Sequence, residues 1–193
     1  MSKTNPASNP IPAHPNVVYR LGIDIGSTTA KVVFLNNEKA VVFSAYQRHN
    51  AEPLATIRTM LRNAEKALGE KSVEVLFTGS AGLGIAEKYT LPFIQEVVAS
   101  AEVVQTLYPE VRTLIDIGGE DAKIIFFDEH ARTDMRMNGS CAGGTGAFID
   151  EMATLLNVPV TELDSLANRH TTIYPMASRC GVFAKTDLQN LLS

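Results

Sequence analysis

The sequence is poor in metal-ligating side chains. Its only two cysteines, Cys141 and Cys180, lie far apart, with no Cys-x-x-Cys pair and no well-spaced histidine pair nearby. A zinc or iron–sulfur site usually needs four ligands. One copy of the chain therefore cannot complete such a site, and a cluster would need a second copy. The alternative is that both cysteines are buried small hydrophobic side chains.

The chain also lacks an excess of basic charge. It carries 17 Lys and Arg against 21 Asp and Glu, a net charge of -4, which gives no electrostatic case for nucleic acid or an anionic membrane as a partner. No apolar run approaches transmembrane length. Residues 1–16 lack the apolar core of a signal peptide and are predicted to form a disordered leader. A cytoplasmic protein with small-molecule or protein partners is expected.

What the chain does contain is a repeated segment. Residues 23–34 and 115–126 are identical at seven of twelve positions without a gap. Each copy is predicted to be a buried strand, a tight turn and a returning strand. Two buried strands could align by chance. The shared Asp, Gly and Lys argue against chance, because acidic residues and glycine are depleted in strands. Two similar halves that face each other are predicted.

The shared positions of the repeat carry a specific chemistry. Asp24 and Asp116 would place one carboxylate from each half in the space between the halves. Glycine, serine and threonine in the turns supply amides and hydroxyls at close range. This combination suits a phosphate chain that carries Mg²⁺.

The order of predicted elements is that of an α/β domain built by duplication. Strands are expected at 21–25, 31–35, 41–45 and 73–77, an amphipathic helix at 54–68, a glycine-rich turn at 78–84 and a helix at 98–107. The lobes would span residues 17–111 and 112–193. The second lobe is expected to be incomplete, because fewer residues follow Ile115 than the first unit uses.

Each cysteine precedes a predicted helix. Cys141 comes before a glycine-rich turn and a helix with an apolar face at Phe148, Met152 and Leu155. Cys180 follows Arg179 and precedes a short helical run. The positive end of a helix and a neighbouring arginine favour the thiolate, which is the form that binds metal.

Four motifs together carry a resemblance to a known family. They are Ile-Asp-Ile-Gly-Ser-Thr-Thr-Ala-Lys, Ile-Asp-Ile-Gly-Gly-Glu-Asp, Cys-Ala-Gly-Gly-Thr-Gly-Ala-Phe and Arg-Cys-Gly-Val-Phe-Ala. In this order and approximate spacing they resemble the BadF/BadG/BcrA/BcrD-type ATPases, from about Tyr19 to the end of the chain. That family includes activators of 2-hydroxyacyl-CoA dehydratases and benzoyl-CoA reductase subunits.

The resemblance implies an actin-like, ribonuclease-H-like duplicated fold that binds ATP or ADP with Mg²⁺. It also implies a homodimer that holds one 4Fe-4S cluster between its subunits through Cys141 and Cys180. Asp24 and Asp116 would organise Mg²⁺ and water. By the same resemblance the phosphates would be lined by three segments: Gly26, Ser27, Thr28, Thr29 and Lys31; Gly118, Gly119 and Glu120; and Gly143, Gly144, Thr145 and Gly146.

The implied activity is the conversion of ATP energy into a low-potential electron. The electron would come from a donor such as ferredoxin or flavodoxin and pass to a dehydratase. The alternatives are a small-molecule kinase of the same fold with an Asp base, and a non-catalytic nucleotide-sensing domain. Two departures from the family stand out: Glu120 replaces its usual Gln, and the family continues past the second cysteine helix into an adenosine-binding segment.

Overall fold

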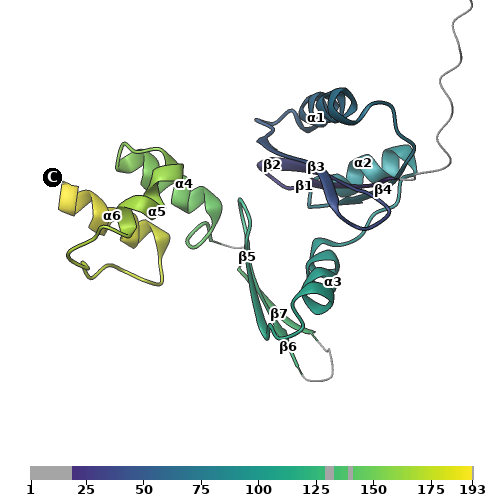
Figure 1. Ribbon diagram of the computed structural model, residues 1–193. Coiled ribbons are helices and arrows are strands. Elements are labelled where there is room, and N and C mark those ends of the chain that lie inside the picture. The colour runs from purple at the N-terminus through teal and green to yellow at the C-terminus, as the bar shows by residue number, and fades with distance from the viewer. Residues whose placement is uncertain (1–18, 129–132, 139–140, 193) are drawn as a thin grey trace, which may run out of the picture.

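A computed structural model describes residues 19–128, 133–138 and 141–192 of the chain. The leader expected at residues 1–16 lies outside this part. Figure 1 shows two β-sheets connected through a helix, and a group of helices at the C-terminal end.

Four strands form the first sheet in the spatial order β3-β2-β1-β4. They are β1 (Tyr19–Ile25), β2 (Thr29–Leu35), β3 (Val41–Arg48) and β4 (Val73–Thr78). The first three are antiparallel neighbours, whereas β4 runs parallel to β1. A parallel pair needs a crossover, and α1 (Pro53–Leu68) provides it. The carboxyl ends of β1 and β4 therefore lie at the same edge of the sheet.

Alternate residues of β1 and β2 face the helices and form the main core. Ile25 and Val32 are fully buried there, against Met60 of α1 and Ala86 of α2 (Gly82–Tyr89). Helix α1 begins with Pro53 in its first turn, where the missing N–H costs nothing, and ends before Gly69 at φ 72°. The apolar period of three and four residues predicted this helix correctly.

The second sheet has the order β5-β6-β7 and is antiparallel throughout. Its strands are β5 (Thr113–Ile117), β6 (Ala122–Phe127) and β7 (Thr133–Asn138). Helix α3 (Glu96–Leu107) connects the sheets and packs on the second one, with Val104 against Ile125 and Phe127. The lobe boundary expected after residue 111 stays a prediction, and α3 precedes it in the chain.

The C-terminal helices follow the second sheet. They are α4 (Gly146–Leu155), a short 3-10 helix (Val160–Glu162), α5 (Leu163–Ala167) and α6 (Gly181–Leu192). Helices after both cysteines were predicted, whereas α5, the 3-10 helix and strand β7 were not.

One local prediction was wrong. The segment from Gly82 to Gly84 was expected to be part of a turn, but α2 already begins at Gly82. The turn lies earlier, at Gly79, whose φ of 91° is left-handed and whose missing side chain leaves room for Asp24 Oδ1 and the Ile25 carbonyl. The neighbouring strand end fixes which glycine makes the turn, and this long-range contact is not visible in local sequence.

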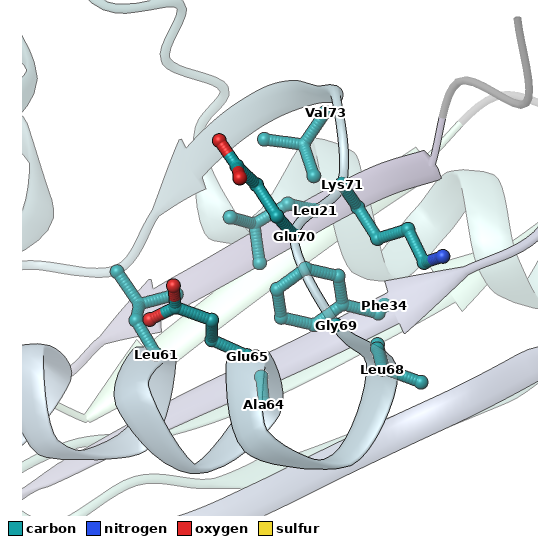
Figure 2. A pocket seen from close by; sticks show the side chains of 10 residues that line it. All are labelled: Leu21, Phe34, Leu61, Ala64, Glu65, Leu68, Gly69, Glu70, Lys71 and Val73. Carbon is teal, nitrogen blue, oxygen red and sulfur yellow. The ribbon is translucent and has the colours of Figure 1, made fainter. Parts of the chain in front are cut away.

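A cavity of about 250 Å³ opens beside the C-terminal end of α1 (Figure 2). Leu21, Phe34 and Leu68 form its apolar floor, and Glu65 and Glu70 lie at its mouth. Leu21 lies near the start of β1, whereas the turn that begins at Gly26 follows the end of that strand. The cavity is thus at the opposite end of β1 from the turn that begins at Gly26.

Candidate functional site

Each copy of the repeat places an aspartate directly opposite a lysine. Asp24 is the cross-strand partner of Lys31, and Lys31 Nζ lies 2.8 Å from Asp24 Oδ2. Asp116 is likewise opposite Lys123, with 3.8 Å between Nζ and Oδ2. The two hairpins therefore share register, turn position and charge pair, and the duplicated hairpin is confirmed.

Lys123 is the more buried of the two lysines. Its side chain is 7% exposed, and its Nζ lies 3.0 Å from Glu96 Oε2 and 3.1 Å from Asp121 Oδ2. Burial lowers the pKa of Lys123, but the hydrogen bonds to Glu96 and Asp121 outweigh it, so the net pKa is raised. Glu96 also contributes to the raised pKa of Lys31. This carboxylate at the start of α3 is thus within electrostatic reach of both hairpins.

We expect Lys123→Met to destabilise the fold by about 2–3 kcal/mol, because hydrogen bonds to charged partners are lost around a buried position. Lys31→Met is the matched control and should cost about 0–1 kcal/mol, since the Lys31 side chain is 46% exposed against 7% for Lys123. Urea unfolding at pH 7 measures both. With a raised lysine pKa, this stabilisation is present below the unfolded pKa of about 10.4 and is lost as pH rises through the folded value. Equal costs for the two variants would contradict this difference in burial.

The first turn, from Gly26 to Thr29, is fixed through its carbonyl groups. The Gly26 N–H donates to the Thr29 carbonyl at 2.9 Å. The carbonyls of Gly26 and Thr28 accept hydrogen bonds from His49, through its ring and its backbone N–H respectively. The turn therefore has a defined backbone conformation.

The second turn, from Gly118 to Asp121, lies against the first. A side-chain carbon added at Gly119 would lie 2.5 Å from Thr28 Oγ1 and 3.0 Å from Ser27 Oγ. Only glycine allows this approach. The helix α4 begins beside the same turn, where the Gly146 and Ala147 N–H groups donate to the carbonyls of Gly118 and Gly119 at 2.8 and 2.9 Å. Three glycine-rich segments far apart in sequence thus meet at one place.

Two buried oxygens near this meeting point have no hydrogen-bond partner among the described residues. They are Asp24 Oδ1 and Thr78 Oγ1, and their residues are register partners on β1 and β4. Unpaired buried oxygens at the carboxyl ends of parallel strands fit a site for water or a cation. Mg²⁺ commonly uses one or two carboxylates together with phosphates and waters, so a single carboxylate from each hairpin suits it.

The two cysteine segments also lie side by side. A side-chain carbon on Gly143 would be 3.1 Å from Gly181 N and 3.4 Å from Cys141 Sγ. Neither thiol is in a disulfide, and the Gly143 N–H donates to Cys141 Sγ at 3.3 Å. A backbone N–H directed at sulfur stabilises a thiolate ligand.

Within the described ranges, no three His, Cys, Asp or Glu side chains form a metal-binding group. The two thiols, which lie on segments that are in contact, are half of a four-thiolate set. This donor set fits a cluster shared by two copies of the chain and does not fit one held by a single copy.

Two ion pairs connect α4 to other elements. Arg48, at the end of β3, lies 2.5 Å from Asp150 on α4. Lys185 on α6 lies 2.5 Å from Glu151, the next residue of α4. Helix α4 is thus connected to the first sheet, to the second turn and to the helix that follows Cys180.

Three polar residues at this site were not predicted. His49, Thr78 and Glu96 approach the turns through β2–β3 pairing, β1–β4 pairing and the start of α3 respectively. A polar residue at the end of a strand was the only signal available for His49 and Thr78. Gly146 lies against Gly118 of the second turn, and Glu120 is exposed at that turn, while the phosphate-binding role of both segments stays a prediction.

In the described part of the chain, no helix is both long and apolar enough to cross a membrane.

Comparison with known proteins finds relatives of this chain. The chain is 35% identical over 185 residues to the (R)-2-hydroxyglutaryl-CoA dehydratase activating ATPase of Acidaminococcus fermentans. The match covers 91% of this chain and 68% of that protein, so the chain spans about two thirds of this relative's length.

Solved structures give the fold. The activator of the 2-hydroxyisocaproyl-CoA dehydratase from Clostridium difficile, with bound ADPNP, aligns with a TM-score of 0.79 and 34% identity, over 91% of this chain and 66% of that one. The ethanolamine utilization protein EutJ from Carboxydothermus hydrogenoformans aligns with a TM-score of 0.55 and 16% identity, over 83% and 63%. The chain has the actin-like ATPase fold that was predicted.

The sequence also matches one protein family, the BadF/BadG/BcrA/BcrD ATPase family, over residues 21–193. This range begins in β1 and includes both hairpins and both cysteine segments. The chain belongs to the BadF/BadG/BcrA/BcrD ATPase family.

Proposed function

We propose that this chain is the nucleotide-binding part of an ATP-dependent activator that delivers a low-potential electron to a 2-hydroxyacyl-CoA dehydratase or a related reductase. Its relatives include a dehydratase activating ATPase and one of the subunits of a benzoyl-CoA reductase. The observation that carries the proposal is the packing of the two cysteine segments against each other. They lie next to helix α4, which begins at the glycine turn of the second hairpin.

The proposed nucleotide site lies between the two hairpins. Ser27, Thr28 and Thr29 would bind phosphates from the first lobe, with Lys31 supplying positive charge. Gly118 and Gly119 would approach from the second lobe, with Gly143 to Gly146 behind them. Asp24 and Asp116 would hold Mg²⁺, which would neutralise phosphate charge and orient the attacking water.

The proposed electron-transfer centre uses the two thiols. Cys141 and Cys180 of one copy, with the same residues of a second copy, would hold one 4Fe-4S cluster, which supplies a one-electron carrier of low potential. Both copies then contribute to one site, so a homodimer is part of the proposal. Ferredoxin or flavodoxin is the proposed electron donor.

Helix α4 provides the proposed coupling between the two sites. Its N-terminus donates hydrogen bonds to the second turn, and Asp150 binds Arg48 of the first sheet. Glu151 binds Lys185 on the helix after Cys180. A change in lobe separation at the phosphates would therefore displace α4 and, with it, the surroundings of both thiols.

Dehydratase activation tests the proposal directly. The full-length gene product, purified without oxygen, is mixed with a dehydratase, ATP and a ferredoxin-type donor. We expect dehydration of a 2-hydroxyacyl-CoA that requires ATP and is absent when ATP is replaced by ADP. Phosphorylation of a small hydroxylated substrate, indifferent to the cysteines, would instead support a kinase.

A further inference from the structure

His49 makes two contacts to the first turn. The residue follows β3 directly and is 6% exposed. Its ring Nε2 lies 3.1 Å from the Gly26 carbonyl oxygen, and its backbone N–H donates to the Thr28 carbonyl at 3.1 Å. One residue therefore holds two of the carbonyl groups of this turn.

The contact defines the form of the ring. A carbonyl oxygen only accepts hydrogen bonds, so Nε2 carries the proton and the neutral ring has its lone pair on Nδ1. Nδ1 is buried and has no hydrogen-bond partner in the part of the chain that the structure describes. A buried imidazole with only one of its two polar atoms satisfied is costly for packing alone. The polar contact that the ring does make is the one from Nε2 to the Gly26 carbonyl of the turn.

The backbone directly after His49 forms a strained turn. Asn50 and Ala51 have φ values of 47° and 64°, in the left-handed region that alanine rarely adopts. The Glu52 N–H closes this turn on the His49 carbonyl at 2.7 Å. Backbone strain of this kind persists where the surrounding structure imposes it, and it is frequent at binding sites.

Holding the carbonyls also fixes the amides. In a trans peptide unit the C=O and the following N–H point in opposite directions. The Gly26 carbonyl that accepts from the His49 ring therefore directs the Ser27 N–H away from that ring, and the Thr28 carbonyl that accepts from the His49 backbone N–H directs the Thr29 N–H away from that N–H. These amides belong to the turn that Gly119 of the second lobe contacts.

We propose that His49 is a positioning residue for the nucleotide phosphates, which orients the Ser27 and Thr29 amides by holding the Gly26 and Thr28 carbonyls from behind. This inference rests on the proposed function and goes further, because it assigns the binding strength of the first turn to a residue outside the repeat. His49 does not itself touch the nucleotide.

Three substitutions at this position test the proposal. His49→Gln keeps an amide N–H close to the place of Nε2, His49→Asn has an amide too short to reach Gly26, and His49→Leu has none. Calorimetry of the full-length protein with Mg-ADP should give a dissociation constant within about threefold of the unsubstituted protein for Gln, and about 10- to 100-fold weaker for Asn and Leu, as expected for an unpaired carbonyl. The stabilisation by ADP in thermal unfolding should fall in parallel.

Met60→Ala is the control for general destabilisation, since Met60 is buried in the same lobe and its substitution opens a cavity in the main core. It should lower the unfolding midpoint and leave the ADP dissociation constant unchanged. Should His49→Leu fail to fold, the difference in ADP dissociation constant between His49→Gln and His49→Asn still tests the inference. Equal ADP binding by Gln and Asn would overturn the inference alone. If the unsubstituted full-length protein bound no nucleotide, the proposed function would fall, and this inference with it.

Discussion

Replacing either Cys141 or Cys180 with serine is expected to abolish dehydratase activation and the visible absorption of the anaerobically purified full-length protein. Each copy offers two thiols, so each substitution removes two of the four ligands of a dimer. Serine keeps the size and hydrogen bonding of the side chain, and Cys141 is exposed, so the fold should change by less than about 1 kcal/mol. Iron and sulfide assays per dimer, with absorption spectra, measure the loss.

The control for this prediction is Ser178→Ala. Ser178 is exposed and lies in the same segment as Cys180, so it reports any general sensitivity of that loop. It should retain one 4Fe-4S cluster per dimer and full dehydratase activation. A colourless dimer from the unsubstituted protein, or a cluster that survives both cysteine substitutions, would refute the shared-cluster assignment.

Features repeated locally in the sequence were the ones that could be predicted. Alternating apolar residues specify the hairpin strands, and the shared Asp, Gly and Lys fall at equivalent register positions because the turns have equal length. The period of α1 and its flanking Pro53 and Gly69 specify that helix. In each case the information lies within a few residues of the element.

Features that depend on pairing between distant segments were missed. His49 reaches Gly26 only because β3 pairs with β2, and Thr78 lies beside Asp24 only because β4 adds in parallel to β1. Strand β7 alternates Met135 and Met137 with Asp134 and Arg136, so it did carry a local period-two signal, which the prediction overlooked. Neighbouring glycines at 143 and 181 bring the cysteine segments together, and nothing in either segment specifies its partner.

We expect Asp24→Asn to lower Mg²⁺-dependent ATP turnover by about 10²–10³-fold, the loss typical of removing one preorganised charged group from a site. Asn has nearly the shape of Asp, so the change removes charge and little packing. Asp24 Oδ1 is buried and unpaired, which makes it available to a cation or water, whereas Oδ2 is occupied by Lys31. Lys31 then loses its partner and stays at the proposed phosphate site, so ADP binding should be retained or strengthened.

Asp116→Asn should lower turnover to a similar extent from the other hairpin, and its fold should be retained because Lys123 keeps Glu96 and Asp121 as partners. Asp134→Asn is the matched control, since Asp134 lies on β7 with a side chain 67% exposed. Steady-state ATPase rates at varied Mg²⁺, beside ADP dissociation constants, separate catalysis from binding. If both hairpin variants turned over ATP within about threefold of the Asp134→Asn protein, the paired carboxylates would have no role in Mg²⁺ chemistry, and the symmetry of the two hairpins would be structural only.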